Sequence, residues 1–121
     1  MALSIPRLKR RTEFLKVAGA RHKWVAPGLI LQARRQTPGN PLQESACPFR
    51  VGYTVSRKVG NAVKRNRAKR RLRSAVTAVL PDHAKEGFDF VIIGRAATLR
   101  RTFPALLNDL ETALKKLDAY R

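Results

Sequence analysis

Residues 50–73 read RVGYTVSRKVGNAVKRNRAKRRLR, and most of the expected architecture can be inferred from them. From Phe49 to Val55, apolar side chains alternate with polar or small ones. A period of two with one apolar face predicts a β-strand. From about Ala62 to Leu80 the apolar residues recur at helical spacing, and Pro81 is expected to end that segment. This part of the chain therefore predicts a strand followed by a long basic helix.

The expected helix has one apolar stripe and is otherwise strongly basic. At about 100° per residue, one arc of about 100° collects the side chains that we expect to face the core: Ala68, Leu72, Ala75, Val76 and Val79. Asn66, Lys69, Arg70 and Arg73 point away from this arc, and Arg67 and Arg71 lie on one flank. Lys64 and Arg65 lie closer to the arc but near the helix start, where a side chain can reach beyond the core edge. The residues expected to bind a ligand belong to this helix and to the turn before it: Arg57, Lys58, Asn61, Lys64, Arg65, Asn66, Arg67, Lys69, Arg70, Arg71 and Arg73.

The ligand expected for this segment is a polyanion. Charged helical faces are usually only solvated, and their charges are then mixed and pair at i,i+4. Here nine Lys and Arg residues between positions 57 and 73 have no acidic neighbour. They also crowd a helix amino terminus, where the macrodipole favours anions. A phosphate would relieve this conflict, because the helix amide groups and the cations both favour it.

The charge of the whole chain agrees with a polyanionic partner. Its 121 residues include 26 Lys and Arg against 8 Asp and Glu, a formal net charge of +18. Residues 1–80 have 19 of these cations and two acids, whereas residues 81–121 have seven cations and six acids. A hydrophobic fraction of 44% argues against general disorder. We therefore expect one folded domain over 1–121, with the polyanion site in its first two thirds.

Weaker patterns complete the expected fold. A short helix is expected to begin near Thr12, and the last helix to run from about Pro104 to Leu117. Leu29 to Arg34 and the largely apolar run Phe88 to Ile93 predict two further strands, the second buried on both faces. Trp24, just before the first of these, is expected to pack at the sheet end. The fold class is α+β, a single-domain α-β sandwich with a small mixed sheet and a basic helix between two strands.

The compartment expected for the protein is the cytoplasm. Cys47 is the only cysteine, so no intrachain disulfide can form and a reducing environment is expected. It lies in a loop expected over Gln36 to Pro48, which is rich in Pro and Gly. No apolar run is long enough to span a membrane, and the amino-terminal segment lacks the apolar core of a secretory signal.

The run from Arg50 to Arg73 resembles the signature of the bacterial ribonuclease P protein family. In that family a strand leads through a turn like Lys58-Val-Gly-Asn-Ala-Val63 into a helix with an Arg-Asn-Arg triplet, here at positions 65–67. Residues 12–17 (TEFLKV) and 89–95 (DFVIIGR) extend the similarity over most of the chain. The resemblance implies an unusual left-handed crossover through the basic helix, although general rules favour a right-handed one.

The resemblance also implies a function. The protein would bind the catalytic RNA subunit of ribonuclease P through the Arg-Asn-Arg region, and the 5′ leader of precursor tRNA in a cleft between the first helix and the sheet. It would thereby promote endonucleolytic removal of the leader, with Mg²⁺ bound by the RNA subunit and no cofactor bound by the protein alone. Phe14 matches an aromatic residue of that cleft. The chain departs from the family at Ala18 and Gln32, where further aromatic residues are often found.

Three other functions are alternatives for such a sequence. A free-standing nuclease needs convergent carboxylates or histidines, but His22 and His83 lie far apart in the sequence and the basic segment has no acid. No catalytic or metal-binding residue of the protein is therefore expected. A structural or ribosome-associated RNA-binding protein with no role in cleavage remains the main alternative, since only the signature distinguishes it. A membrane-surface helix is least favoured, because the apolar stripe of the basic helix lacks Trp and Phe anchors.

Overall fold

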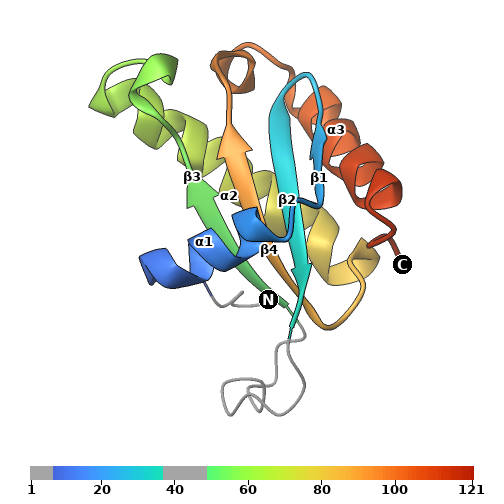
Figure 1. Cartoon of the computed structure of the whole chain (residues 1–121). Helices are drawn as coiled ribbons and strands as arrows, with labels where there is room; N and C mark the ends of the chain where they lie inside the picture. Colours follow the sequence, from blue (N-terminus) through green and yellow to red (C-terminus); the bar gives the residue numbers. More distant parts are fainter. Residues whose placement is uncertain (1–6, 37–48) are drawn as a thin grey trace.

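A four-stranded mixed sheet and three α-helices make up the part of the chain that the computed structural model describes, residues 7–36 and 49–121 (Figure 1). In chain order the elements are α1 Arg11–Gly19, β1 Lys23–Val25, β2 Leu29–Arg35, β3 Phe49–Thr54, the 3₁₀ helix η2 Arg57–Val59, α2 Ala62–His83, β4 Phe88–Gly94, the 3₁₀ helix η3 Ala96–Leu99 and α3 Phe103–Lys116. The strand order is β1-β2-β4-β3. β3 and β4 are parallel, and the other two pairs are antiparallel. The α+β class and the basic helix between two strands are confirmed.

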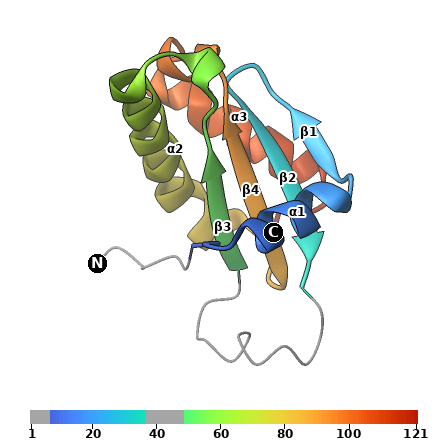
Figure 2. The ribbon, with the colours of Figure 1, turned by 60° about the vertical axis from the view of Figure 1, so that its left-hand side comes forward.

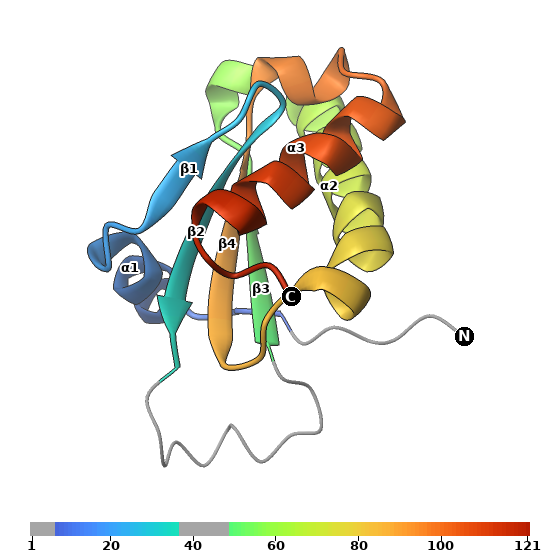
Figure 3. The ribbon, with the colours of Figure 1, turned by 90° about the vertical axis from the view of Figure 1, so that its right-hand side faces the viewer.

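The helices cover the two faces of the sheet unequally. α2 and α3 pack on one face, and α1 crosses the other (Figures 2 and 3). The main core lies between the sheet and α2 and α3, and its fully buried side chains include Leu31, Leu72, Phe90 and Leu110. The smaller cluster under α1 consists of Leu8, Val17 and Val91, with Phe14 and Ile93 packed against it.

β4 is the central strand in the order of the sheet, between β2 and β3. Phe90 and Ile92 belong to the main core, while Val91 belongs to the cluster under α1. A strand with neighbours on both sides and helices on both faces needs a nearly continuous apolar run. The predicted burial of this strand on both faces is confirmed.

α2 connects the parallel strands β3 and β4 by a left-handed crossover. In Figure 1 both strands point upward, β4 lies to the right of β3, and α2 passes behind the sheet while α1 lies in front of it; Figures 2 and 3 agree. About 98% of such connections are right-handed, and a right-handed one here would place α2 on the face that α1 occupies. The left-handed path instead leaves the α1 face free of the basic helix.

A buried ion pair holds α1 against the sheet. Asp89 of β4 is 3% exposed and accepts hydrogen bonds from Nε and Nη2 of Arg50, at 3.0 and 2.7 Å. The same guanidinium donates from Nη1 to Glu13 of α1 at 2.7 Å. The Asp89 hydrogen bonds, which outweigh the opposing effect of burial, raise the pKa of Arg50 above its usual value. One β3 side chain therefore joins α1 to the central strand.

The turn between β1 and β2 packs closely on α3 and η3. The N–H of Gly28 donates to Oδ2 of buried Asp109 in α3 at 3.0 Å, and a Cβ on this glycine would lie 2.6 Å from that oxygen. The Thr98 hydroxyl of η3 donates to the Gly28 carbonyl at 2.6 Å. Pro27 and Gly28 thus form part of a hairpin turn between β1 and β2.

The expected end of the basic helix at Pro81 is wrong. α2 continues to His83 with Pro81 inside its last turn. Proline removes one helical hydrogen bond, but the Ala84 N–H still donates to the Leu80 carbonyl at 3.0 Å and the Arg121 N–H donates to the His83 carbonyl at 2.7 Å. The helix thus continues past the proline, and Arg121 binds a carbonyl of its last turn that has no helical donor.

Other differences from the sequence analysis are small. β1 was not predicted, because a strand of three exposed residues has no apolar alternation to detect. Trp24 lies within it, 37% exposed, with the Lys116 ammonium 5.4 Å from its ring centroid. α1 and α3 each begin one residue earlier than expected. From residue 37 onward, the expected loop over Gln36 to Pro48, with Cys47, falls outside the described residues.

Candidate nucleic-acid interface

A tight turn at Gly60 and Asn61 precedes α2. Gly60 has φ +150°, where glycine is favoured, and a Cβ on it would lie 2.7 Å from the Lys64 side chain. Asn61 caps the helix by accepting a hydrogen bond from the Lys64 N–H at 3.0 Å. The first N–H groups of any α-helix have no helical carbonyl to bind, and here they lie in a segment without an acid. This arrangement favours a phosphate.

Most of the residues predicted to bind RNA are exposed. Arg57, Lys58 and Asn61 lie in the exposed turn before α2. The basic face of α2 is formed by its exposed polar residues Lys64, Asn66, Arg67, Arg70 and Arg73. Arg65, Lys69 and Arg71 are half-buried. The structure thus places the eleven predicted residues along the turn and the outward and flanking sides of one helix.

These cations have no acidic partner within the described residues. The ion pairs found there involve Arg50, His83, Lys85 and Arg101, none of which belongs to the predicted set. The basic face of α2 therefore presents charge that no carboxylate of residues 7–36 or 49–121 neutralises. Polyphosphate backbones are the biological ligands that match such a surface.

Arg71 differs from the other cations because its guanidinium is held by the protein. Its Nε donates to the Thr98 carbonyl at 3.0 Å, and its Nη2 donates to the Arg101 carbonyl. These bonds fix α2 against η3 and the segment that leads into α3. Sequence spacing placed Arg71 on a flank of the helix, but it could not indicate that backbone carbonyls would occupy two of its donors.

Arg65 carries an unsatisfied donor. Its Nε is buried and, among the described residues, has no hydrogen-bond partner. Leaving a buried donor unpaired is costly, so an incoming acceptor that reached this guanidinium would remove the cost. The helical wheel placed Arg65 close to the apolar arc, and the half-buried side chain agrees with that position.

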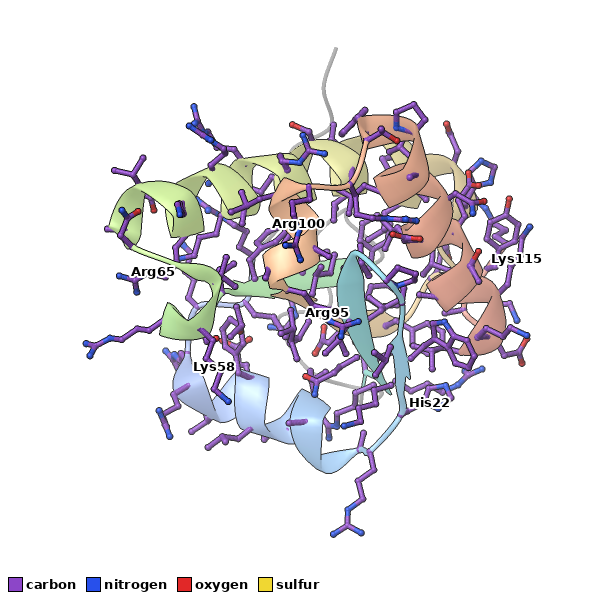
Figure 4. The ribbon with its side chains drawn as sticks, turned by 90° about the horizontal axis from the view of Figure 1, so that it is seen from above. His22, Lys58, Arg65, Arg95, Arg100 and Lys115 are labelled. Atoms are coloured by element: carbon purple, nitrogen blue, oxygen red, sulfur yellow. The ribbon has the colours of Figure 1, made fainter. Side chains whose placement is uncertain are left out.

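Two exposed arginines near this surface were not predicted as site residues. Arg95 follows β4 and Arg100 follows η3, and both lie at the end of the molecule where Lys58 and Arg65 also lie (Figures 1 and 4). β3 and β4 are parallel, so their carboxyl ends meet at one edge of the sheet. The parallel pairing of β3 and β4 could have indicated that Arg95 lies near α2, but this pairing cannot be known from the sequence alone.

Phe14, predicted as a cleft residue, lies on the α1 face of the sheet. Its ring packs over Gly52 of β3, where a Cβ would lie 2.5 Å from the ring carbon Cε1. It also contacts the cluster of Leu8, Val17 and Val91, and it remains half-buried. The ring thus contributes to packing and keeps part of its surface at the solvent.

Ala18 and Gln32 are brought together by the fold. Both line one pocket of about 340 Å³ between the end of α1 and β1 and β2, together with Val17, Arg21, His22 and Lys23. Two positions that depart from the family pattern therefore belong to a single site, whose lining has two cationic side chains, an amide and an imidazole but no Phe, Tyr or Trp ring. His22 also hydrogen-bonds the Leu117 carbonyl through Nε2 at 2.8 Å.

Two further findings concern other kinds of site. Within residues 7–36 and 49–121, no three His, Cys, Asp or Glu side chains gather in a way that could hold a metal ion. In the same residues, no helix combines the length and the apolar character needed to cross a bilayer.

Comparison with known proteins gives one consistent result. The family model described as Ribonuclease P matches residues 5–118. A protein named "Ribonuclease P protein component" from Paramagnetospirillum magneticum is 55% identical over 119 residues, which cover 98% of this chain and 87% of that protein. The protein of the same name from Gluconacetobacter diazotrophicus is 48% identical over 116 residues, with coverages of 96% and 94%.

A solved structure supports the fold. The RNase P protein of Staphylococcus aureus superposes with a TM-score of 0.75 at 24% identity, covering 98% of this chain and 100% of that one.

Proposed function

Since the chain belongs to the ribonuclease P protein family, we propose that it binds the catalytic RNA of ribonuclease P through the basic face of α2 and the turn before it. It is the protein component of the enzyme that processes tRNA 5′ ends. The family match over nearly the whole chain favours this role over that of a structural RNA-binding protein. The cytoplasm, where precursor tRNA is made in bacteria, is the proposed location.

The unneutralised charge of α2 is the observation that carries this proposal. Each phosphate that a Lys or Arg side chain neutralises releases condensed counterions, which drives association. The left-handed crossover turns the basic face of α2 away from the α1 face of the sheet, so the two faces can contact different RNA segments. We assign the catalytic RNA to the α2 side and the leader of precursor tRNA to the α1 side.

The chemistry of cleavage belongs, in this proposal, to the RNA subunit and to Mg²⁺ that the RNA binds. The described residues of the protein contain no cluster of His, Cys, Asp or Glu side chains that could bind this ion. The contribution of the protein is to bind and orient RNA, and to replace part of the cation screening that the RNA needs. Catalysis should therefore depend less on Mg²⁺ concentration when the protein is present.

Reconstitution tests the division of labour. Protein freed of RNA should leave precursor tRNA intact at any Mg²⁺ concentration. Addition of the cognate catalytic RNA should give the mature 5′ end at Mg²⁺ concentrations where the RNA alone is slow. Cleavage by rigorously RNA-free protein would overturn the proposal.

The α1 face is the proposed leader site, and Phe14 is its test residue. Stacking of a leader base on the exposed part of its ring is worth about 1–3 kcal/mol and tolerates any base. Phe14→Ala should weaken binding of precursors with leaders of several nucleotides, and should leave the affinity of the holoenzyme for mature tRNA unchanged. Because the ring also packs on Gly52, thermal unfolding of the variant must be measured alongside. An equal loss for precursor and mature tRNA would assign Phe14 to packing alone.

A further inference from the structure

An open pocket lies beside α2 where η3 joins α3. Its volume is about 470 Å³, within the range of small-ligand sites. Six residues line it, from three elements: Arg67, Arg70, Arg71, Ser74, Leu99 and Phe103. None of these is acidic, so three guanidinium groups share the pocket without a carboxylate in its lining.

The three arginines of this pocket are arranged differently. Arg71 forms a fixed wall, because its side chain is bound to the carbonyls of Thr98 and Arg101. Arg67 and Arg70 are exposed and, within the described residues, make no ion pair. The pocket therefore combines one immobilised guanidinium with two that are available to an anion.

Phe103 gives the pocket an aromatic surface. It is the first residue of α3 and its side chain is 38% exposed. Among the described residues its ring stacks on no other aromatic ring and carries no cation over its face, whereas the similarly exposed Trp24 has the Lys116 ammonium over its ring. A free π-face next to free guanidiniums fits a ligand that is both aromatic and anionic.

We propose that this pocket binds one unpaired nucleotide of an RNA strand, with the base stacked on Phe103 and the phosphate held by Arg67 and Arg70. The inference rests on the proposed RNA-binding function and adds to it a site for single-stranded RNA. Base–aromatic stacking is sequence-tolerant and requires a base that is not paired in a duplex. A site for phosphate alone would not need the exposed ring.

The first experiment compares two ligands with equal phosphate content. Full-length protein is titrated against a labelled oligoadenylate of eight nucleotides and against an abasic oligomer of the same length, and binding is followed by fluorescence anisotropy. Phe103→Ala should weaken oligoadenylate binding about tenfold and leave abasic binding unchanged. Phe103→Leu, which keeps apolar volume without a ring, should show the same loss, and Phe103→Trp should bind like the parent. Trp24→Leu, a matched exposed aromatic outside the pocket, should also bind like the parent.

A second measurement reports on the site itself. The chain has one tryptophan, so the double variant Trp24→Phe/Phe103→Trp carries its only indole in the pocket. Oligoadenylate should quench that fluorescence and the abasic oligomer should not. Absence of quenching, full affinity in Phe103→Leu, or equal losses for both ligands would overturn the pocket assignment.

These outcomes can be separated from failure of the proposed function. If Arg67→Ala weakens both ligands while every Phe103 variant binds like the parent protein, the basic face of α2 binds RNA and the nucleotide pocket is disproved. If the parent protein binds neither oligomer, the RNA-binding function fails and the pocket proposal fails with it.

Discussion

Arg67 and Arg71 lie one helical turn apart on the same flank of α2 but have different partners. Arg67 is exposed, and Arg71 donates to the carbonyls of Thr98 and Arg101. Arg71→Ala should lower the free energy of unfolding by about 1–3 kcal/mol, since two partly buried carbonyls lose their donor. Arg67→Ala should change it by less than about 0.5 kcal/mol, and should reduce the slope of log affinity for RNA against log salt by about 0.7–0.9.

Urea unfolding and RNA titrations at several salt concentrations measure both effects. A destabilised Arg67→Ala protein with an unchanged salt slope would contradict the assignment of Arg67 to the RNA.

Because of Tyr53 in β3, we expect the free energy of unfolding to change with pH in the alkaline range. Burial raises the pKa of its phenol to about 12, although the charges of Arg73 and Arg7 act in the opposite direction. The unfolded chain loses this proton near pH 10, so between about pH 10 and 12 the folded state binds more protons than the unfolded state. The contribution of Tyr53 to stability is therefore complete below about pH 10 and falls as the pH rises, by about 2–3 kcal/mol in all.

Tyr53→Phe removes the titrating group and leaves the ring. The difference in unfolding free energy between the parent protein and this variant, measured in urea at pH 9 and again near pH 12, should change by that amount in favour of the variant. A difference independent of pH would show that the phenol ionises equally in both states. Taking the difference cancels the titration of the lysines, which affects both proteins alike.

Among the elements, α1 is joined to the sheet by a charged side chain from β3. Arg50 of β3 bridges Glu13 of α1 and buried Asp89 of β4. Arg50→Met should cost about 3–5 kcal/mol, because the Asp89 carboxylate would remain buried without its charged partner. Glu13→Gln removes only the ion pair between Arg50 and Glu13, which is the more exposed of the two, and should cost less than about 1 kcal/mol. Hydrogen exchange of the α1 amides, faster in Arg50→Met than in Glu13→Gln, would locate the effect; equal rates would contradict it.

The elements also differ in how far the sequence could predict them. The basic helix, its turn and the central strand follow from periodicity and charge, because each is long and one-sided or uniformly apolar. β1 could not be predicted, since its three residues pair through the backbone while their side chains stay exposed. The end of α2 was predicted too early: Arg121, forty residues from Pro81, donates to the carbonyls of Pro81, Asp82 and His83, and no local rule contains these contacts. General packing rules would also have given the wrong handedness for the crossover, which only the family resemblance implied.

At the candidate site, local patterns identified the residue types but not their partners. The cations of α2 were predicted from their number and spacing, and the tertiary bonds of Arg71 were not. Arg95, Arg100 and Phe103 lie near α2 because β4 pairs with β3 and η3 packs against α2, and a single sequence does not show which elements are neighbours.

For the molecule as a whole, the net charge of +18 opposes its own compaction. Anions that bind the folded protein stabilise it by mass action, since the unfolded chain spreads the same charges over a larger volume. Sodium sulfate should therefore raise Tm more than sodium chloride at equal ionic strength. The variant Arg67→Ala/Arg70→Ala should show a smaller excess, and identical effects of the two salts would indicate general screening only. Differential scanning fluorimetry is sufficient for this comparison.

The place of β4 in the sheet has a consequence for how the protein is made. Both β2 and β3 pair with β4, and β4 is the last strand in the sequence. Until β4 has been synthesised, the β1–β2 hairpin is the only pair of the described strands that the growing chain can form, and α2 has no completed sheet to pack on. Pairing between distant segments is slow, and domains fold as units during translation. The nascent chain therefore leaves the ribosome with its most cationic helix still unpacked, and the RNA-binding surface is completed only near the end of synthesis.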